Sequence, residues 1–260
     1  MSARNASAVA FRLILELKTP YIPPATTPTL DGILWGALSR CLGQASPVPL
    51  DAILTRSHGV FHGSRAATAD ALSAENDSVT FYRSLMRERE QMPEFFFDKK
   101  RYPRFSGRSH DDVTKDVRYV VVGDNKRGFF KPFLNKYPLV LGANPETDDS
   151  LLTVAFFGHG DIERVRGLLR FLPGIGRKVR QGYGLIGSVR IDVIDQDISL
   201  VRDGYPMRPI PAEEWETIHG HHALQARPMA VVPPYLISPP VLAVAPEDSI
   251  FVRIPKETML

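Results

Sequence analysis

The sequence of 260 residues contains a single cysteine, Cys41. One thiol cannot form an intramolecular disulfide, and four-sulfur metal sites need more thiolates than this chain contains. Cysteine usage therefore indicates a reducing compartment.

Long hydrophobic runs are also missing. No stretch approaches the ~18 uninterrupted apolar residues of a membrane-spanning helix. The apolar part of residues 1–18 contains Arg12 and Glu16, so it lacks the continuous core of a signal peptide. Hydrophobic residues make up 43% of the chain, enough for one elaborated domain or two small ones. We expect a folded, soluble, cytoplasmic protein with no membrane partner.

Net charge is only +3, but the charge is unevenly distributed. Residues 164–190 contain seven basic side chains and no acid, and residues 99–136 contain eleven basic and four acidic ones. Residues 192–260 reverse the balance, with ten acids and five bases. This asymmetry is typical of a polyanion-binding face backed by a neutralising one, although an ordinary solvated basic surface would also produce it.

Alternating and helical hydrophobic patterns define the expected elements. We expect strands at 9–18, 117–122, 151–157 and 185–194, an edge strand near 129–134, and helices at 29–43, 78–90 and 161–172. Thr29 and Gly43 should cap the first helix, whose start we also expect Asp31 to hold through backbone N–H groups. Gly32 and Gly36 lie four residues apart on that helix, which indicates close approach of another backbone.

The order strand, helix, strands, helix, strand fits an α+β fold with a ferredoxin-like (RRM-like) βαββαβ sheet. We expect this domain at residues 1–200, with an insertion at about 55–115 after the first helix. Residues 201–260 form a Pro-rich extension that should pack on the domain without an independent core, because ten prolines fall between 206 and 260.

Residues 174–184, GIGRKVRQGYG, combine four glycines with three cations and are called the G-loop below. This is neither a P-loop nor a dinucleotide-binding fingerprint, because it follows a helix instead of opening one. Since it faces the negative end of that helix dipole, anion binding would depend on cationic side chains and glycine-permitted N–H groups. The alternative is a helix C-cap, with Gly174 ending the helix and a turn following.

A helix followed by G-x-G-[RK]-[RK]-x-x-Q-G-[YF]-G and then a strand resembles the signature loop of the CRISPR-associated RAMP superfamily. Residues 27–38 (TPTLDGILWGAL), 156–169 (FFGHGDIERVRGLL) and 204–211 (GYPMRPIP) resemble the family-five-type subunit of type IV CRISPR effector complexes. The resemblance covers residues 9–45 and 151–211. It implies a ferredoxin-like fold and a non-catalytic subunit that caps the 5′ handle of the guide RNA. The resemblance implies the backbone and large subunits as partners, with target DNA as a further candidate partner.

Two groups of residues are therefore candidates for binding RNA. The first is the G-loop with the preceding helix: Gly174, Gly176, Arg177, Lys178, Arg180, Gln181, Gly182, Tyr183, Gly184, Arg166 and Arg170. The second is an aromatic and basic run in the insertion: Lys99, Lys100, Arg101, Tyr102, Arg104 and Arg108. Cations interleaved with aromatic rings suit single-stranded nucleic acid, since bases stack on the rings. The alternative for the run is a buried strand at 95–97 beside a solvated basic stretch.

No arrangement of nucleophile and base stands out in the sequence, so we expect neither catalysis, nor a cofactor, nor a bound metal. A second hypothesis is a metal-independent endoribonuclease that processes precursor guide RNA with a histidine base. Its candidates are His58, His62, His110 and His159. A third hypothesis is a basic protein-interaction module with no RNA ligand.

Overall fold

The computed structural model describes residues 8–24, 27–42, 50–69, 71–73, 78–81, 86–88, 117–122, 125–130, 135–143, 152–219, 225–235, 237–246 and 251–259. The chain divides into two compact units. The main unit consists of Met1–Asp77 and Pro138–Leu260, and the second of Ser78–Tyr137. Each unit is described by itself below.

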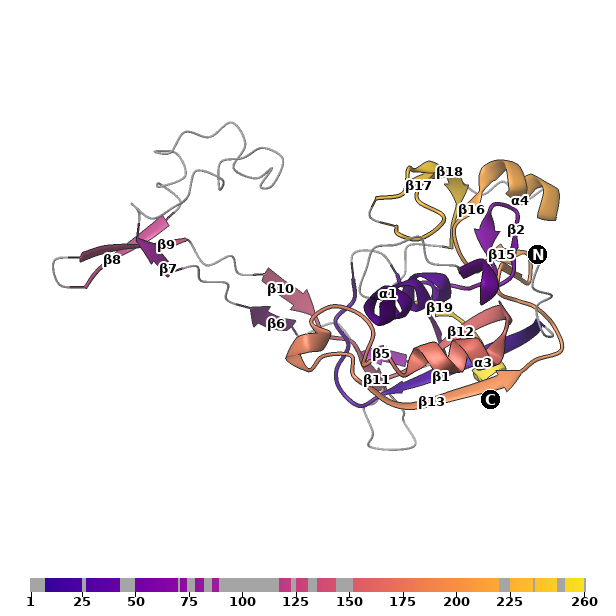
Figure 1. Ribbon diagram of the computed structural model, residues 1–260, viewed down its shortest axis with the longest axis horizontal. Helices are drawn as coiled ribbons and strands as arrows, with labels where there is room; N and C mark the ends of the chain where they lie inside the picture. Colours follow the sequence, from indigo (N-terminus) through magenta and orange to yellow (C-terminus); the bar gives the residue numbers. More distant parts are fainter. Residues whose placement is uncertain are drawn as a thin grey trace. The chain divides into compact units, whose positions relative to one another are not determined.

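A five-stranded mixed sheet forms the centre of the main unit, which is an α+β structure (Figure 1). Its strands, in spatial order, are β13 (Ile186–Val193), β1 (Val9–Leu17), β12 (Thr153–Gly160), β4 (Ala67–Thr68) and β19 (Val252–Arg253). Strand β1 pairs antiparallel with both β12 and β13, and β4 pairs antiparallel with β12. Only β19 pairs in parallel, along β4.

Two helices, α1 (Leu30–Leu42) and α3 (Ile162–Leu169), cover one face of this sheet. The alternation of β1 places its large apolar side chains on that face, as the sequence predicts. These residues and their helical partners are Phe11, Leu13, Leu15, Leu17, Leu30, Leu34, Ala37, Val165, Leu168 and Leu169. The opposite face is also covered, because Ile14 packs with Phe157, Met207 and Ile254 in a second, smaller core.

Both helices begin at a side-chain cap, and the one at Thr29 is the cap expected from the sequence. Thr29 Oγ1 accepts a hydrogen bond from the Gly32 N–H at 3.2 Å, and Asp161 Oδ1 accepts one from the Arg164 N–H at 3.1 Å. Each bond satisfies one of the N–H groups left open at a helix start. Residue Gly43, expected to end the first helix, lies outside the described residues.

The C-terminal part is more regular than its proline content predicts. Its elements are β14 (Val201–Arg202), β15 (Tyr205–Pro206), β16 (Ile210–Pro211), α4 (Ala212–His219), β17 (Arg227–Met229), β18 (Val241–Val244) and α5 (Lys256–Met259). Strands β16, β18 and β17 form a small sheet, and Trp215 of α4 packs with Ile210 and Val244 in a third core. That core includes Val60 from the N-terminal part, so the extension shares it with the main domain.

Short elements connect α1 to the main sheet. They are η1 (Leu50–Ala52) and the hairpin strands β2 (Arg56–Ser57) and β3 (Val60–Phe61). After the main-sheet strand β4 comes β5 (Ala71–Ser73), which pairs with β11 (Leu141–Ala143). The strand between α1 and β12 in the main sheet is therefore β4, inside the region expected to be an insertion. Two small residues carry too little pattern to reveal a strand from sequence.

The second unit contains β6 (Ser78–Phe81), β7 (Met86–Glu88), β8 (Val117–Val122), β9 (Asn125–Phe130) and most of β10 (Asn135–Pro138). Strands β7, β9 and β8 form one sheet, and β10 pairs with β6. The prediction of a helix at 78–90 is therefore wrong. Its first residues, Ser-Val-Thr-Phe, include β-branched and aromatic side chains that favour a strand, and partner strands decide the outcome. Strand β9 also begins before the expected 129–134.

Candidate nucleic-acid interface

The G-loop leaves helix α3 and closes on its own backbone. Gly174 and Leu185 form an isolated β-bridge, and the Ile175 N–H donates to Gly184 O at 2.9 Å. Between them, η5 (Val179–Gln181) forms a single 3₁₀ turn. The predicted loop is therefore a hydrogen-bonded loop closed at its base, and more than a helix cap.

Three of its four glycines are needed for packing within the protein. A Cβ on Gly174 would lie 2.4 Å from Gly184 O, and one on Gly184 would lie 2.1 Å from Ile175 O. Gly176 has φ +89° and would bring a Cβ within 2.6 Å of Ile22 O. Only Gly182, at φ +92°, has open space where its Cβ would be. Most of the glycines thus allow the loop to fold against its neighbours.

Several N–H groups of the loop are already occupied by protein acceptors. The Arg177 N–H donates to Ile22 O at 2.8 Å, and the Gly184 N–H donates to Pro20 O at 2.8 Å. The N–H groups of Gln181 and Gly182 donate back into the turn. Because an occupied donor cannot also bind a phosphate well, anion binding here depends mainly on side chains.

The side chains of the loop differ in exposure. Those of Arg180 and Gln181 are exposed, whereas Arg177, Lys178 and Tyr183 are half-buried and make contacts with the rest of the protein. Within the described part of the chain, Arg180 pairs with no carboxylate. Arg180 is therefore the loop cation best placed to meet a ligand.

A groove of about 690 Å³ lies beside the G-loop. Gly174 and Gly176 form part of its wall, and one face of α1 and the segment around β17 form the rest. Three arginines line it, namely Arg40, Arg65 and Arg227, and none of the described lining residues is acidic. The other predicted loop residues do not line the groove. Sequence patterns did not identify these three arginines, which the fold brings to one groove.

Two glycines of α1 face this groove, for different reasons. A Cβ on Gly32 would lie 3.0 Å from the Tyr235 ring, so Gly32 lets that ring pack on the helix. Gly36 has no neighbouring atom within 4 Å of a Cβ position, so it leaves the groove open. The expected close approach of another backbone is therefore wrong for Gly32, where a side chain approaches.

The arginines keep different amounts of hydrogen-bonding capacity. Arg65 is buried, and its guanidinium donates to Thr27 Oγ1 and to Pro246 O. Arg40 is exposed and donates from Nη1 to Phe171 O at 3.2 Å. Since a guanidinium carries five N–H donors, Arg40 retains donors for a ligand.

A buried ion pair supports one wall of the groove. Arg208 and Asp31 are both fully buried, with Nη2 and Oδ2 3.1 Å apart. The Tyr235 hydroxyl donates to the same Asp31 oxygen at 2.7 Å and accepts from Thr29 Oγ1 at 2.9 Å. Burial raises the pKa of Tyr235, which keeps this hydroxyl protonated as a donor.

This cluster corrects the role predicted for Asp31. Its carboxylate binds Arg208 and Tyr235, and Thr29 caps the helix instead. Arg208 also donates to Gly63 O at 3.0 Å and Val231 O at 2.6 Å, so it joins separate segments of the chain. The signal in the sequence was a lone arginine within the apolar, proline-rich stretch 206–211.

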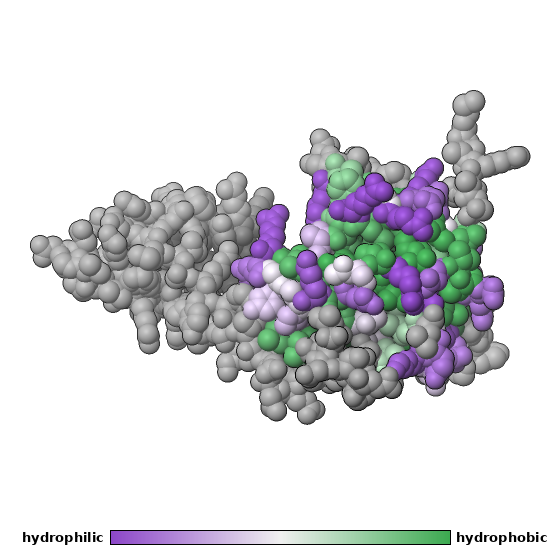
Figure 2. All heavy atoms as spheres, turned by 90° about the horizontal axis from the view of Figure 1, so that it is seen from below, coloured by the Kyte–Doolittle hydropathy of each residue, from purple (hydrophilic) through white to green (hydrophobic). Residues whose placement is uncertain are grey.

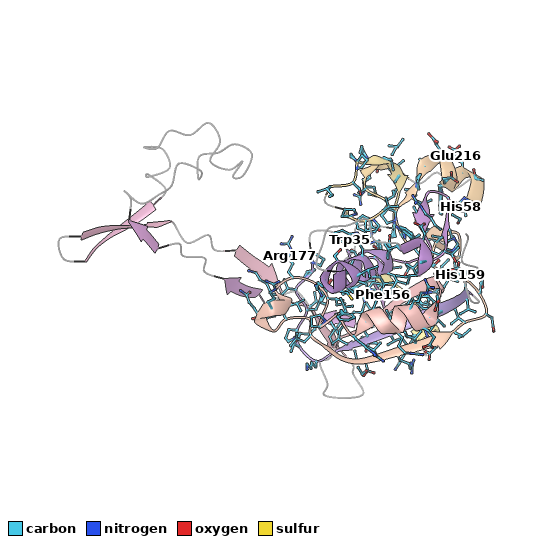
Figure 3. The ribbon with its side chains drawn as sticks, in the orientation of Figure 1. Trp35, His58, Phe156, His159, Arg177 and Glu216 are labelled. Atoms are coloured by element: carbon cyan, nitrogen blue, oxygen red, sulfur yellow. The ribbon has the colours of Figure 1, made fainter. Side chains whose placement is uncertain are left out.

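The remaining candidates lie elsewhere. Arg166 is exposed on α3 and pairs with Glu163, and Arg170 is exposed at the end of that helix. Figure 3 places His58 and His159 at the opposite end of the main unit from Arg177. The basic run, Lys99, Lys100, Arg101, Tyr102, Arg104 and Arg108, lies outside the described residues, as does His110.

In the described part of the chain, no three side chains of the metal-binding types gather closely enough to hold an ion. No helix among those residues is long and apolar enough to cross a membrane. No family model matches the chain, and no curated protein matches it with significant similarity.

Proposed function

We propose that the chain is an RNA-binding subunit of a type IV CRISPR effector complex that holds the 5′ handle of the guide RNA without cleaving it. The observation that carries the proposal is the groove beside the G-loop, lined by three arginines and by no described acid. A phosphodiester chain needs such an excess of cations, because each phosphate carries a negative charge.

The order of the sheet supports a ferredoxin-like RAMP fold for this subunit. Taking β1, β4, β12 and β13 as the first to fourth strands, their spatial order is fourth, first, third, second. All three pairings among them are antiparallel. Helices α1 and α3 follow the first and third of these strands, as in a βαββαβ unit.

The chemistry of the groove suits a single strand. Arg40 and Arg227 line the groove and can neutralise phosphates. Arg180 is exposed on the G-loop and is a further candidate for contact with the RNA backbone. Apolar side chains, including Ile33 and Met229, offer a surface for nucleobases between the charged positions. Single-stranded nucleic acids are bound by this combination of cations and apolar contact.

The edge of the sheet is a candidate contact with the other subunits of the complex. Val189 and Val193 on the edge strand β13 are 45% and 66% exposed. Figure 2 shows hydrophobic side chains at the surface between hydrophilic ones on one face of the molecule. An edge strand with exposed apolar side chains is a typical protein-binding surface. Contact with target DNA and a cytoplasmic location remain parts of this proposal.

The salt dependence of guide-RNA binding tests the proposal. If about four to six phosphates are neutralised, log K should fall with log salt at a slope near −3 to −4. Arg40→Gln with Arg227→Gln should make the slope shallower by about 1.4, because each lost phosphate contact removes about 0.7.

Arg56→Gln is the matched control, since Arg56 is exposed outside the groove and its guanidinium lies over Phe61. This control should leave the slope unchanged. Guide-RNA binding by the groove variant with wild-type affinity and slope would overturn the proposal. If the variant with Arg177, Lys178 and Arg180 all changed to Ala keeps the wild-type affinity and slope, the G-loop is not part of the RNA-binding site.

A further inference from the structure

A tight hairpin brings a serine and a histidine together, away from the groove. Strands β2 and β3 pair across a two-residue tip formed by His58 and Gly59, which have φ +50° and +70°. Ser57 precedes the tip and His62 follows the second strand. His58 is labelled in Figure 3, with His159 nearby and Arg177 at the far end of the unit.

Ser57, His62 and Asp197 form a continuous hydrogen-bonded relay. Ser57 Oγ lies 2.6 Å from His62 Nε2, and Asp197 Oδ2 lies 2.5 Å from His62 Nδ1. A carboxylate can only accept, so Nδ1 carries the proton and Nε2 is left to accept from the Ser57 hydroxyl. This tautomer is the one a histidine needs to act as base toward a serine.

The carboxylate of this relay is held in place and ionised. The Ser199 N–H donates to Asp197 Oδ1 at 2.9 Å, while Oδ2 binds His62. Burial by itself would raise the pKa of Asp197, but the hydrogen bonds from His62 and Ser199 outweigh it and lower the pKa. Asp197 can therefore orient the imidazole and stabilise its protonated form.

We infer that Ser57 is a nucleophile toward uncharged carboxylic esters, with His62 as its base and Asp197 as the residue that positions His62. Ser57 is half-buried and not enclosed in the protein interior. Carboxylates of Asp51 and Glu214 also lie at this hairpin, paired with Arg56 and His58. With Asp197 they outnumber Arg56, the exposed arginine of the hairpin, which favours a neutral ester over a phosphodiester.

The reaction would follow an acyl-transfer sequence. Ser57 Oγ attacks the ester carbonyl and forms the bond to the acyl carbon while its proton passes to His62 Nε2. The tetrahedral intermediate then breaks its C–O bond to the alcohol, which takes that proton as it leaves. Water, deprotonated by the same nitrogen, hydrolyses the acyl-serine and restores the hydroxyl. The N–H groups of His58 and Gly59 have no acceptor among the described residues, so they are free to stabilise the oxyanion.

A second hydroxyl–imidazole pair in the same cluster serves as a control. Thr55 Oγ1 lies 2.7 Å from His159 Nδ1, and the His159 ring centroid lies 5.8 Å from that of His62. No described carboxylate pairs with His159. Thr55 thus has a histidine neighbour but no complete relay.

Phosphonylation by a fluorophosphonate probe, mapped by mass spectrometry, tests the inference. Attack by Ser57 forms an O–P bond, breaks the P–F bond, and releases fluoride as the proton passes to His62. We expect modification at Ser57, lost in Ser57→Ala and at least about 100-fold slower in His62→Gln. Asp197→Asn should slow it as well, and Thr55→Ala should not.

The second measurement is the release of p-nitrophenol from p-nitrophenyl acetate, which should show a burst that depends on Ser57. Circular dichroism of each variant checks folding, and Ser57→Ala removes only a half-buried hydroxyl. An unmodified Ser57, or equal rates in wild-type protein and His62→Gln, would overturn the inference. Guide-RNA binding should be the same in Ser57→Ala and wild type, so the two proposals fail independently.

Discussion

The main unit contains two kinds of arginine, which differ in what their guanidinium nitrogens bind. Arg208 is fully buried, and its guanidinium donates to Asp31 and to the backbone carbonyls of Gly63 and Val231. Arg40 and Arg180 are exposed, beside the groove and on the G-loop. A buried guanidinium with its donors used stabilises the fold, whereas an exposed one keeps donors for a ligand.

The buried arginine stays charged because of its partner, Asp31. Burial lowers the pKa of Arg208, but the nearby Asp31 carboxylate more than compensates and the pKa is raised. Removing one partner of such a pair leaves the other charge buried without compensation. The two kinds of arginine should therefore respond very differently to the same substitution.

The largest expected effect is on stability, in Arg208→Met. The variant leaves Asp31 fully buried without its cation, which should lower the free energy of unfolding by about 3–5 kcal/mol. Urea denaturation followed by circular dichroism measures it. Arg180→Met is the matched control and should stay within about 0.5 kcal/mol of wild type, since Arg180 is exposed. Equal losses of unfolding free energy in the two variants would contradict this difference between buried and exposed arginines.

Gly184→Ala tests whether the G-loop is built by packing. Its φ of +60° and a Cβ position 2.1 Å from Ile175 O should together lower the unfolding free energy by about 1–3 kcal/mol. Gly182→Ala provides the control, because φ is +92° there but the space is open. Thermal unfolding measures both variants. An equal loss of stability in Gly182→Ala and Gly184→Ala would contradict this prediction.

Tyr235→Phe tests whether the Tyr235 hydroxyl contributes only to the buried cluster or also to binding in the groove. The variant loses a hydroxyl that donates to Asp31 and accepts from Thr29, at an expected cost of about 1–2 kcal/mol in unfolding free energy. Its ring still lines the groove, so guide-RNA affinity of the folded variant should be unchanged. A filter-binding titration in which affinity falls with the hydroxyl would place that group in the ligand site.

Local features of the fold were predictable, and features that depend on pairing were not. The caps at Thr29 and Asp161 and the alternation of β1 follow from residues close in sequence. The two-residue strand β4 carries no comparable pattern. The helix expected at 78–90 gave way to strands because their partners, β9 and β10, lie far along the chain.

The candidate sites also contain parts that the sequence predicted and parts that it did not. The G-loop was visible as one contiguous string, but the groove arginines stand at positions 40, 65 and 227 and meet only in the fold. Ser57 and His62 are near neighbours in sequence, yet Asp197, which completes their relay, is 135 positions beyond His62. Spacing rules find sites carried by one segment, whereas these sites are assembled from several.

The smallest expected effect distinguishes the open groove from an ordinary helix surface. Gly36→Ala on α1 and Gly167→Ala on α3 both add a methyl group where no atom lies within 4 Å. Each should raise the unfolding free energy by up to about 1 kcal/mol, because alanine favours a helix more than glycine does. Only Gly36 lines the groove, so only its variant should bind guide RNA more weakly. If both variants gain equal stability and bind guide RNA with equal affinity, the RNA does not pass along this face of α1.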